Sequence, residues 1–293
     1  MSENTATPSD WLTGARPHTW ANAVAPVLAG TAAAVHDGQA SWVRAVLAGV
    51  VAMALIIGVN YANDYSDGIR GTDDDRTGPL RLTGSGLVPP ERVKYAAFLS
   101  FGVAGVAGVI LSLMSAWWLV LVGALCILGA WFYTGGKNPY GYRGLGEVAV
   151  FVFFGLVAVT GTEFTQSGTV SWVGLLLAVG VGSLSASVNL VNNLRDIPTD
   201  REAGKTTLAV ILGDRPTRVL YVALVSVSVL VTVAVSATGI AALISLAAVP
   251  LLFVAALPVV RGAGGKDLIP VLGLTGRAML VWSLTMFVAM LLE

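Results

Sequence analysis

Long apolar runs alternate with short polar breaks along almost the whole chain. A helix that crosses a bilayer needs about 20 mostly apolar residues, and about nine runs approach that length. They cover residues 20–35, 42–63, 94–113, 117–133, 146–162, 172–191, 219–237, 240–260 and 270–292. The pattern predicts an all-α, polytopic membrane protein, with about nine transmembrane helices around a central cavity. We expect one domain over residues 1–293, with a polar segment at 1–18.

Composition agrees with a membrane protein. The chain is 55% hydrophobic and 12% charged, with a mean hydropathy of +0.78, whereas a soluble domain is roughly a quarter charged. The net charge is zero, so nothing indicates a nucleic-acid partner. Cys126 is the single cysteine, which excludes a disulfide within the chain and a thiol-rich metal site. The polar start lacks the basic and apolar regions of a cleaved signal peptide.

The basic residues divide unevenly between the two predicted sides of the membrane. With nine spans, all of the 17 Lys and Arg residues except Arg44 fall on the side of the N-terminus. Cytoplasmic loops carry an excess of Lys and Arg, so we expect this side to be cytoplasmic and the chain to lie in the cell membrane. Four tryptophans begin spans from the opposite side, as an interfacial aromatic belt would: Trp42, Trp117, Trp118 and Trp172.

Residues 60–75, NYANDYSDGIRGTDDD, end the second apolar run with a cluster of polar side chains. If the helix continues, Asn60, Asn63 and Asp67 lie on one of its faces. Carboxylates beside hydrocarbon need a partner or a use. Hard oxygen ligands suit Mg²⁺, which keeps positions for water and phosphate oxygens. The acids of this stretch are Asp64, Asp67, Asp73, Asp74 and Asp75.

A second cluster, in residues 189–208, ends the sixth run on the same predicted side. Asn192, Asp196 and Asp200 are spaced to stack along a helix, unless Pro198 breaks it and puts Asp200 at a turn. Basic residues follow both clusters, and the loop 133–147 adds more. Acids, amides and bases together suit a metal diphosphate, because Mg²⁺ bridges carboxylate to phosphate while Arg and Lys bind the remaining oxygens. The nearby basic residues and tyrosines are Arg70, Arg76, Arg81, Arg201, Lys205, Lys137, Arg143, Tyr140 and Tyr142.

Several of these segments resemble one known family. The motifs NDYSDGIRGTD and NNLRDIPTDREAGKTTLAV are similar to the two Asp-rich signatures of the UbiA superfamily of intramembrane prenyltransferases. RPHTW, RLTGSGLV and YGYRGLGE resemble the branch that prenylates 1,4-dihydroxy-2-naphthoate in menaquinone synthesis. Gly71 stands where the broader superfamily has a third Asp, an arrangement common in that branch. Asp73, Asp74 or Asp75 takes its place, and the sequence leaves open which.

The resemblance implies a Mg²⁺-dependent transfer of a polyprenyl group from polyprenyl diphosphate to 1,4-dihydroxy-2-naphthoate. CO₂ and diphosphate are lost, and demethylmenaquinone results. The expected metal ligands are Asn63, Asp64, Asp67, Asp73, Asp196 and Asp200. The expected catalytic residues are Asp67, Asp196, Asp200 and Lys205. The expected substrate-binding residues are Arg16, Asn60, Arg70, Lys137, Tyr142, Arg143, Asn193, Arg201 and Lys205.

Other interpretations remain open at this point. The acceptor could be 4-hydroxybenzoate, homogentisate or haem. A cation-coupled transporter would also use intramembrane acids, although both clusters lie at a membrane edge rather than mid-span. Lys137 and Arg143 could act only as topology signals. Glu147 is expected to cap a helix N-terminus, and Glu163 is expected on the surface at the far side. The sequence assigns no base that removes a ring proton.

Overall fold

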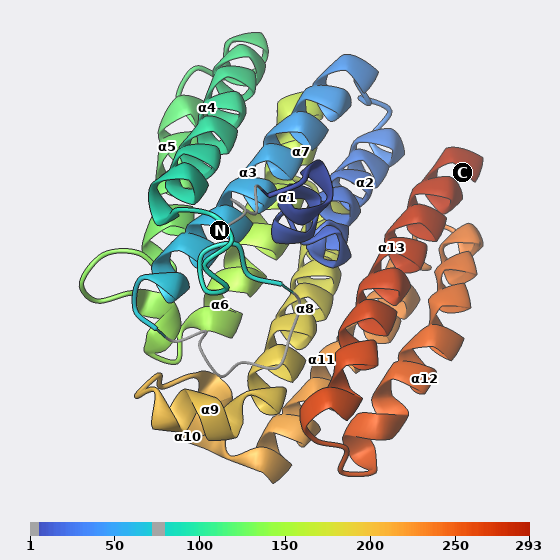
Figure 1. Cartoon of the computed structure of the whole chain (residues 1–293). Coiled ribbons are helices and arrows are strands. Elements are labelled where there is room, and N and C mark those ends of the chain that lie inside the picture. The colour runs from blue at the N-terminus through green and yellow to red at the C-terminus, as the bar shows by residue number, and fades with distance from the viewer. Residues whose placement is uncertain (1–5, 72–79) are drawn as a thin grey trace.

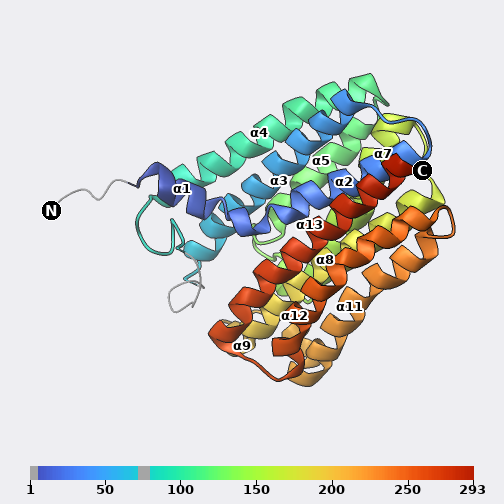
Figure 2. The same ribbon diagram turned by 90° about the vertical axis from the view of Figure 1, so that its right-hand side faces the viewer.

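The computed structural model describes residues 6–71 and 80–293, and these form a bundle of helices (Figures 1 and 2). The long uninterrupted helices are α2 (Ala21–His36), α3 (Trp42–Gly68), α4 (Pro90–Met114), α5 (Leu119–Phe132), α8 (Trp172–Arg195), α11 (Asp214–Val235) and α13 (Ile269–Leu292). Two further crossings are composite: α6 (Gly146–Val150), the π-helical η3 (Phe151–Val157) and α7 (Ala158–Ser167) are continuous, as are η4 (Ile240–Ala248) and α12 (Val249–Val260). The connections contain α1 (Pro8–Gly14), η1 (Pro17–Thr19), η2 (Tyr140–Tyr142), α9 (Ile197–Glu202), α10 (Leu208–Leu212) and η5 (Gly265–Leu268).

The predicted all-α, polytopic architecture is confirmed. Within the described residues, seven helical segments are long and apolar enough to cross a membrane. α2 and α5, with 16 and 14 residues, are shorter but occupy the places of the first and fourth predicted spans. The arrangement is therefore compatible with nine crossings, although length and composition identify seven.

Polar residues set the ends of several helices. The Ser171 hydroxyl accepts a hydrogen bond from Gly174 N at the start of α8, which satisfies one of the free amides of the first turn. Gly168, with φ 77°, ends α7 in the left-handed conformation that glycine adopts without steric cost. α8 ends at Arg195, and Pro198 lies in the first turn of α9. The helix therefore breaks at Asp196, one of the two alternatives that the sequence left open, because proline suits the beginning of a helix but not its interior; Asp200 lies within α9 rather than at a turn.

α8 lies at the centre of the bundle. Of its most apolar window, 72% is buried inside the protein, against 28–44% for the other six long segments. Small residues allow neighbouring helices to approach it, as is common in membrane proteins. A Cβ atom on Gly155 would lie 2.5 Å from the Cα of Gly182, so η3 and α8 touch through their backbones at this crossing.

Two hydrophobic cores flank the end of the bundle that carries the motifs. One unites buried residues of α2, α8, α11 and α13, among them Leu184 and Trp282. The other lies between α1, α3, α4 and the segment around Leu82. In Figure 1 the last turns of α3 and α8 point downward, toward the end where α9 and α10 lie. The motif-bearing ends of two helices from different cores therefore share one end of the molecule.

The opposite end corrects one expectation. Glu163, predicted to lie on the surface, is fully buried. Its Oε1 accepts hydrogen bonds from the backbone N and the hydroxyl of Ser171, at 2.8 and 2.5 Å, because the chain folds back from α7 into α8 over this side chain. Arg44, the one basic residue assigned to that side, donates to the carbonyl of Thr165 at the same end.

Candidate active site

The end of α3 presents Asn63 and Asp67, both buried, to the loop between α5 and α6. The helix continues to Gly68, so the predicted common face of Asn60, Asn63 and Asp67 is present. Thr134 Oγ1 donates to Asn63 Oδ1 at 2.7 Å, and Tyr142 Oη donates to Asp67 Oδ1 at 2.5 Å. The loop thus meets the first Asp-rich motif directly.

Arg81 brings a positive charge to the same carboxylate. Its Nη2 lies 3.7 Å from Asp67 Oδ2, and the two side chains are each 11% exposed. The segment that carries Arg81 is held by Asp64, whose two carboxylate oxygens accept hydrogen bonds from Leu82 N and Thr83 N, both at 2.8 Å. Asp64 was expected to bind metal. It is fully buried with both oxygens on backbone amides, and this geometry makes it an anchor for the segment.

This anchoring role predicts a local effect of Asp64→Ala. We expect the amide hydrogens of Leu82 and Thr83 to exchange at least about tenfold faster, because hydrogen bonds to charged groups contribute about 1.5–3 kcal/mol. Hydrogen exchange with mass spectrometry measures this. Asp214→Ala is the control, since the Asp214 side chain is 61% exposed and pairs with Arg218. Unchanged exchange in Asp64→Ala would remove the anchoring role.

Asn60 also has a structural partner where a substrate contact was expected. Its Nδ2 donates to Ala15 O and to Thr19 Oγ1, both at 2.9 Å, and it is 3% exposed. Thr19 in turn donates its hydroxyl to the carbonyl of Arg16, at 2.8 Å. Arg16 has a φ of 52°, a left-handed conformation that is uncommon outside glycine. Asn60 therefore fixes the turn that positions Arg16.

The second Asp-rich motif forms ion pairs around the junction of α8 and α9. Arg195 makes two hydrogen bonds of 2.7 Å to the carboxylate of Asp196 and one of 3.0 Å to Asn192 Oδ1. Lys205 Nζ lies 3.3 Å from Asp200 Oδ1, and Thr207 Oγ1 donates to Asp200 Oδ2 at 3.4 Å. The buried carboxylates are thus balanced by neighbouring cations, as burial of a charge requires.

Tyr142 joins the two motifs. While its hydroxyl contacts Asp67, its ring has Lys205 Nζ 5.3 Å and the Arg70 guanidinium 5.5 Å from its centroid. Both separations fall within the range of cation–π attraction. Thr206 N also donates to the carbonyl of Tyr142 at 3.1 Å. One side chain therefore contacts the acid of the first motif and the lysine of the second.

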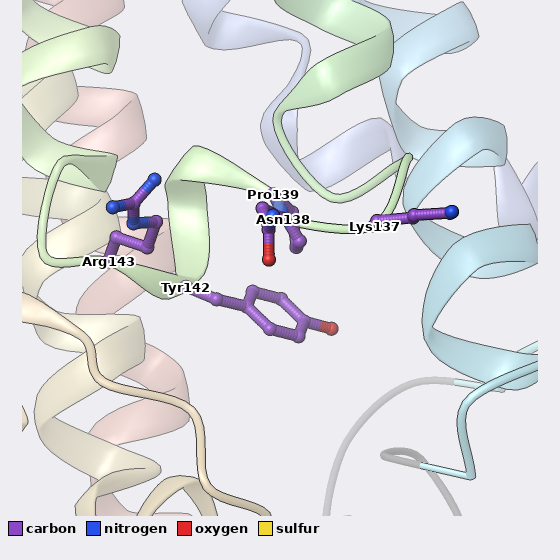
Figure 3. A pocket seen from close by; sticks show the side chains of 5 residues that line it. All are labelled: Lys137, Asn138, Pro139, Tyr142 and Arg143. Atoms are coloured by element: carbon purple, nitrogen blue, oxygen red, sulfur yellow. The ribbon is translucent and has the colours of Figure 1, made fainter.

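A cavity of about 390 Å³ lies beside Tyr142, lined by Lys137, Asn138, Pro139, Tyr142 and Arg143. Figure 3 shows the Tyr142 ring extending below Asn138 and Pro139, with Lys137 and Arg143 pointing away in different directions. Arg70, which donates to the carbonyls of Thr134 and Gly136, holds the start of this loop. The exposed Lys137, Arg143 and Arg201 belong to the same end of the molecule without touching the central carboxylates through any described contact.

The N-terminal segment reaches the second motif. Burial and the neighbouring positive charges of Arg16 and Arg195 lower the pKa of His18 from its ordinary value. The segment of His18 therefore lies in the field of the same arginine that pairs with Asp196. The expected proximity of Arg16 to the site fits this arrangement.

The carboxylates and cations of the two motifs match the needs of a magnesium diphosphate. Asp67, Asp196 and Asp200 offer hard oxygen atoms, and each is already paired with a cation: Arg81, Arg195 and Lys205. A bound metal could replace these cations on the carboxylates, while the freed cations bind phosphate oxygens. Within residues 6–71 and 80–293, no three acidic, histidine or cysteine side chains form a ready metal cluster. The arrangement suits a metal that arrives with its anionic ligand. Asp73 lies outside the described residues.

Sequence reasoning did not assign several contacting residues. Arg195 makes the shortest ion pair of the second motif, 2.7 Å from Asp196. The two residues are neighbours in the sequence, and helical spacing does not predict contacts between neighbours. Arg81 was noted only as a basic neighbour. Asn193, expected to bind substrate, donates instead to Glu147 Oε1 at 2.6 Å. Glu147, expected to cap a helix N-terminus, lies in the first turn of α6 and is 4% exposed, and α6 has no side-chain capping hydrogen bond.

Comparison with known proteins identifies the family. The sequence profile described as the UbiA prenyltransferase family matches residues 23–284. The chain belongs to this family. A 1,4-dihydroxy-2-naphthoate octaprenyltransferase of Mycobacterium tuberculosis is 58% identical to this UbiA family prenyltransferase over 276 residues, covering 94% of each chain. The protein of the same name from Escherichia coli is 39% identical over 211 residues, covering 70% of this chain and 68% of that protein.

Solved structures share the fold of this UbiA family member. An apo UbiA homologue from Aeropyrum pernix K1 superposes with a TM-score of 0.72 at 17% identity, covering 91% of this chain and 97% of that one. A UbiA homologue from Archaeoglobus fulgidus, bound to GPP and Mg²⁺, gives a TM-score of 0.66 at 13% identity, covering 96% and 99%. At these identities the likeness establishes the fold.

Proposed function

We propose that this prenyltransferase moves a polyprenyl group from polyprenyl diphosphate to 1,4-dihydroxy-2-naphthoate, giving demethylmenaquinol, the reduced form of demethylmenaquinone. The observation that carries the proposal is the 58% identity, over 94% of both chains, to a protein named for that reaction. The geometry supports it, because Tyr142 joins two acid-and-base motifs of the kind that a metal diphosphate needs. In this proposal one membrane domain performs the whole reaction, and the site faces the cytoplasm from the cell membrane.

One set of residues binds the metal, and another set binds the diphosphate. Asn63, Asp67, Asp196 and Asp200 hold Mg²⁺, while Arg81, Arg195 and Lys205 transfer from their carboxylates to phosphate oxygens. When bound, the metal supplies Lewis-acid stabilisation of the departing diphosphate. Asp64 remains an anchor, and Asn60 supports Arg16. Further positive charge at this end of the molecule comes from Lys137, Arg143, Arg70 and Arg201. This charge raises the local concentration of an anionic substrate.

The reaction then needs one carbon–oxygen bond and one carbon–carbon bond to break, and one carbon–carbon bond to form. The allylic C–O bond breaks with its electron pair leaving on the diphosphate. A ring carbon of the acceptor attacks the allylic carbon, and the bond between the ring and the carboxylate breaks, its electron pair returning to the ring as CO₂ leaves. The half-buried Tyr142 ring and the surrounding apolar helices limit the access of water, which would otherwise capture the cation. The membrane location suits the donor, because its polyprenyl tail is soluble in lipid.

The proposal predicts the outcome of an acceptor panel. Purified protein with Mg²⁺ and a polyprenyl diphosphate should prenylate 1,4-dihydroxy-2-naphthoate and release one CO₂ for each product, measured by chromatography and ¹⁴CO₂ trapping. The parallel acceptors are 4-hydroxybenzoate and homogentisate. Turnover confined to 4-hydroxybenzoate would overturn the acceptor assignment, and no diphosphate release with any acceptor would overturn prenyl transfer itself.

A further inference from the structure

A group of buried and half-buried polar side chains lies next to the diphosphate site, and the mechanism above does not use it. It consists of Tyr133, Glu147, Asn189 and Asn193. Glu147 Oε1 accepts a hydrogen bond of 2.6 Å from Asn193 Nδ2, and Asn189 Oδ1 accepts one of 3.5 Å from Tyr133 Oη. The second oxygen of Glu147 and the Nδ2 of Asn189 are both buried, and neither makes a hydrogen bond of standard geometry in the described structure, although the two side chains lie close enough to interact.

Two of these polar groups lie beside Gly146. A Cβ atom at this position would lie 3.1 Å from Tyr133 Oη and 3.2 Å from Asn189 Nδ2. Gly146 precedes Glu147 at the start of α6, so the phenol, the amide and the carboxylate surround the first turn of one helix. The Tyr133 ring is fixed by an edge-on contact with Tyr140, their centroids 5.5 Å apart. The group thus offers one acceptor atom, on Glu147, and one donor atom, on Asn189, that make no hydrogen bond of standard geometry.

Its position relative to the diphosphate site follows from helix geometry. Asn189, Asn193 and Asp196 are spaced at i, i+4 and i+7 and lie on one face of α8 and its cap. With a rise of about 1.5 Å per residue, Asn193 and Asn189 lie about 5 and 10 Å deeper in the membrane than Asp196. α6 begins two residues after Gly144, and the preceding Arg143 pairs with Thr206 of the second motif. The group therefore lies on the membrane side of the site.

The missing partners define the ligand chemistry. A buried polar atom without a hydrogen bond costs about 1–3 kcal/mol, so this pair is stabilised by any ligand that satisfies both atoms. A hydroxyl group can donate to the Glu147 oxygen while it accepts from the Asn189 amide. A ligand carboxylate could not, since it has no hydrogen to donate to Glu147.

We propose that Glu147 and Asn189 bind a ring hydroxyl of the aromatic acceptor, namely the 4-hydroxyl of 1,4-dihydroxy-2-naphthoate. This inference rests on the proposed function. The 1-hydroxyl is adjacent to the acceptor's own carboxyl group and donates to it, so the 4-hydroxyl is the free one. Its hydrogen bond to Glu147 raises the electron density of the ring that attacks the allylic carbon. Asn193 and Tyr133 are positioning residues that orient Glu147 and Asn189.

The test compares two acceptors that differ by one hydroxyl, 1,4-dihydroxy-2-naphthoate and 1-hydroxy-2-naphthoate. Their dissociation constants are measured by calorimetry with Mg²⁺ and a non-hydrolysable polyprenyl thiodiphosphate bound. Wild-type protein should prefer the dihydroxy acceptor by about 10- to 100-fold, the range expected for a hydrogen bond to a charged group. Glu147→Gln and Asn189→Ala should each reduce that preference to within about threefold, with thiodiphosphate affinity unchanged.

Glu163→Gln is the matched control, because Glu163 is equally buried at the other end of the same crossing and should leave the preference intact. A wild-type preference retained in both Glu147→Gln and Asn189→Ala overturns this inference while the proposed function stands. Equal weakening of both acceptors also overturns it, because that result indicates a purely structural role. Wild-type protein that fails to prenylate the dihydroxy acceptor overturns the proposed function, and this inference with it.

Discussion

Asp67→Asn should lower kcat/KM for prenyl transfer by about 10³-fold, the size of effect seen when a group that stabilises transition-state charge is removed. Asparagine keeps the shape of the side chain and an oxygen that can accept the hydrogen bond from Tyr142 Oη. It removes the negative charge that pairs with Arg81 and that we propose holds the metal. The fold should survive, while the Mg²⁺ concentration for half-maximal rate rises.

Diphosphate release at a series of Mg²⁺ concentrations measures both quantities. Asp214→Asn is the control, because that exposed acid forms an ion pair with Arg218 at one helical turn and lies outside the site. Size-exclusion chromatography in detergent checks folding. A rate within a few-fold of wild type, with an unchanged Mg²⁺ requirement, would remove Asp67 from the proposed metal site.

Asp196→Ala should abolish turnover and also destabilise the protein. The side chains of Arg195 and Asp196 are 4% and 6% exposed. Removing one partner of a buried ion pair leaves the other charge without compensation, which typically costs about 3–5 kcal/mol. Thermal unfolding in detergent should show a lower midpoint for this variant than for Asp67→Asn.

A double variant separates the two consequences. Arg195→Met combined with Asp196→Ala removes the isolated charge, so most of the lost stability should return while turnover stays absent. Stability that remains as low in the double variant as in Asp196→Ala would show that the ion pair is not the cause. Normal turnover in either variant would exclude Asp196 from catalysis.

The sequence predicts which site residues share a helix face better than it predicts their hydrogen-bond partners. The spacing of Asn60, Asn63 and Asp67 correctly predicts one shared face, because α3 continues to Gly68. Asp64 lies one helical turn from both Asn60 and Asp67, so helical spacing alone does not reveal its separate role as an anchor. Gly68 ends the helix against Thr83, whose Cγ2 would lie 2.4 Å from a Cβ at this position.

Partners that come from distant segments were not predictable from local patterns. Asn60 faces the carbonyl of Ala15, 45 residues away, and Tyr142 faces Asp67, 75 residues away. Both contacts depend on how the helices pack rather than on helical periodicity. Glu163 was misplaced for the same reason, because only the fold shows that the turn into α8 closes over it.

The two hydrogen bonds from Asn60 also make the leading segment an integral piece of the molecule. Removing the residues before α2 would delete the carbonyl of Ala15 and the hydroxyl of Thr19. The buried side-chain amide of Asn60 would then lose both of its hydrogen-bond acceptors. The segment from Ala15 to Thr19, which precedes the first membrane crossing, is therefore part of the packing next to the first Asp-rich motif.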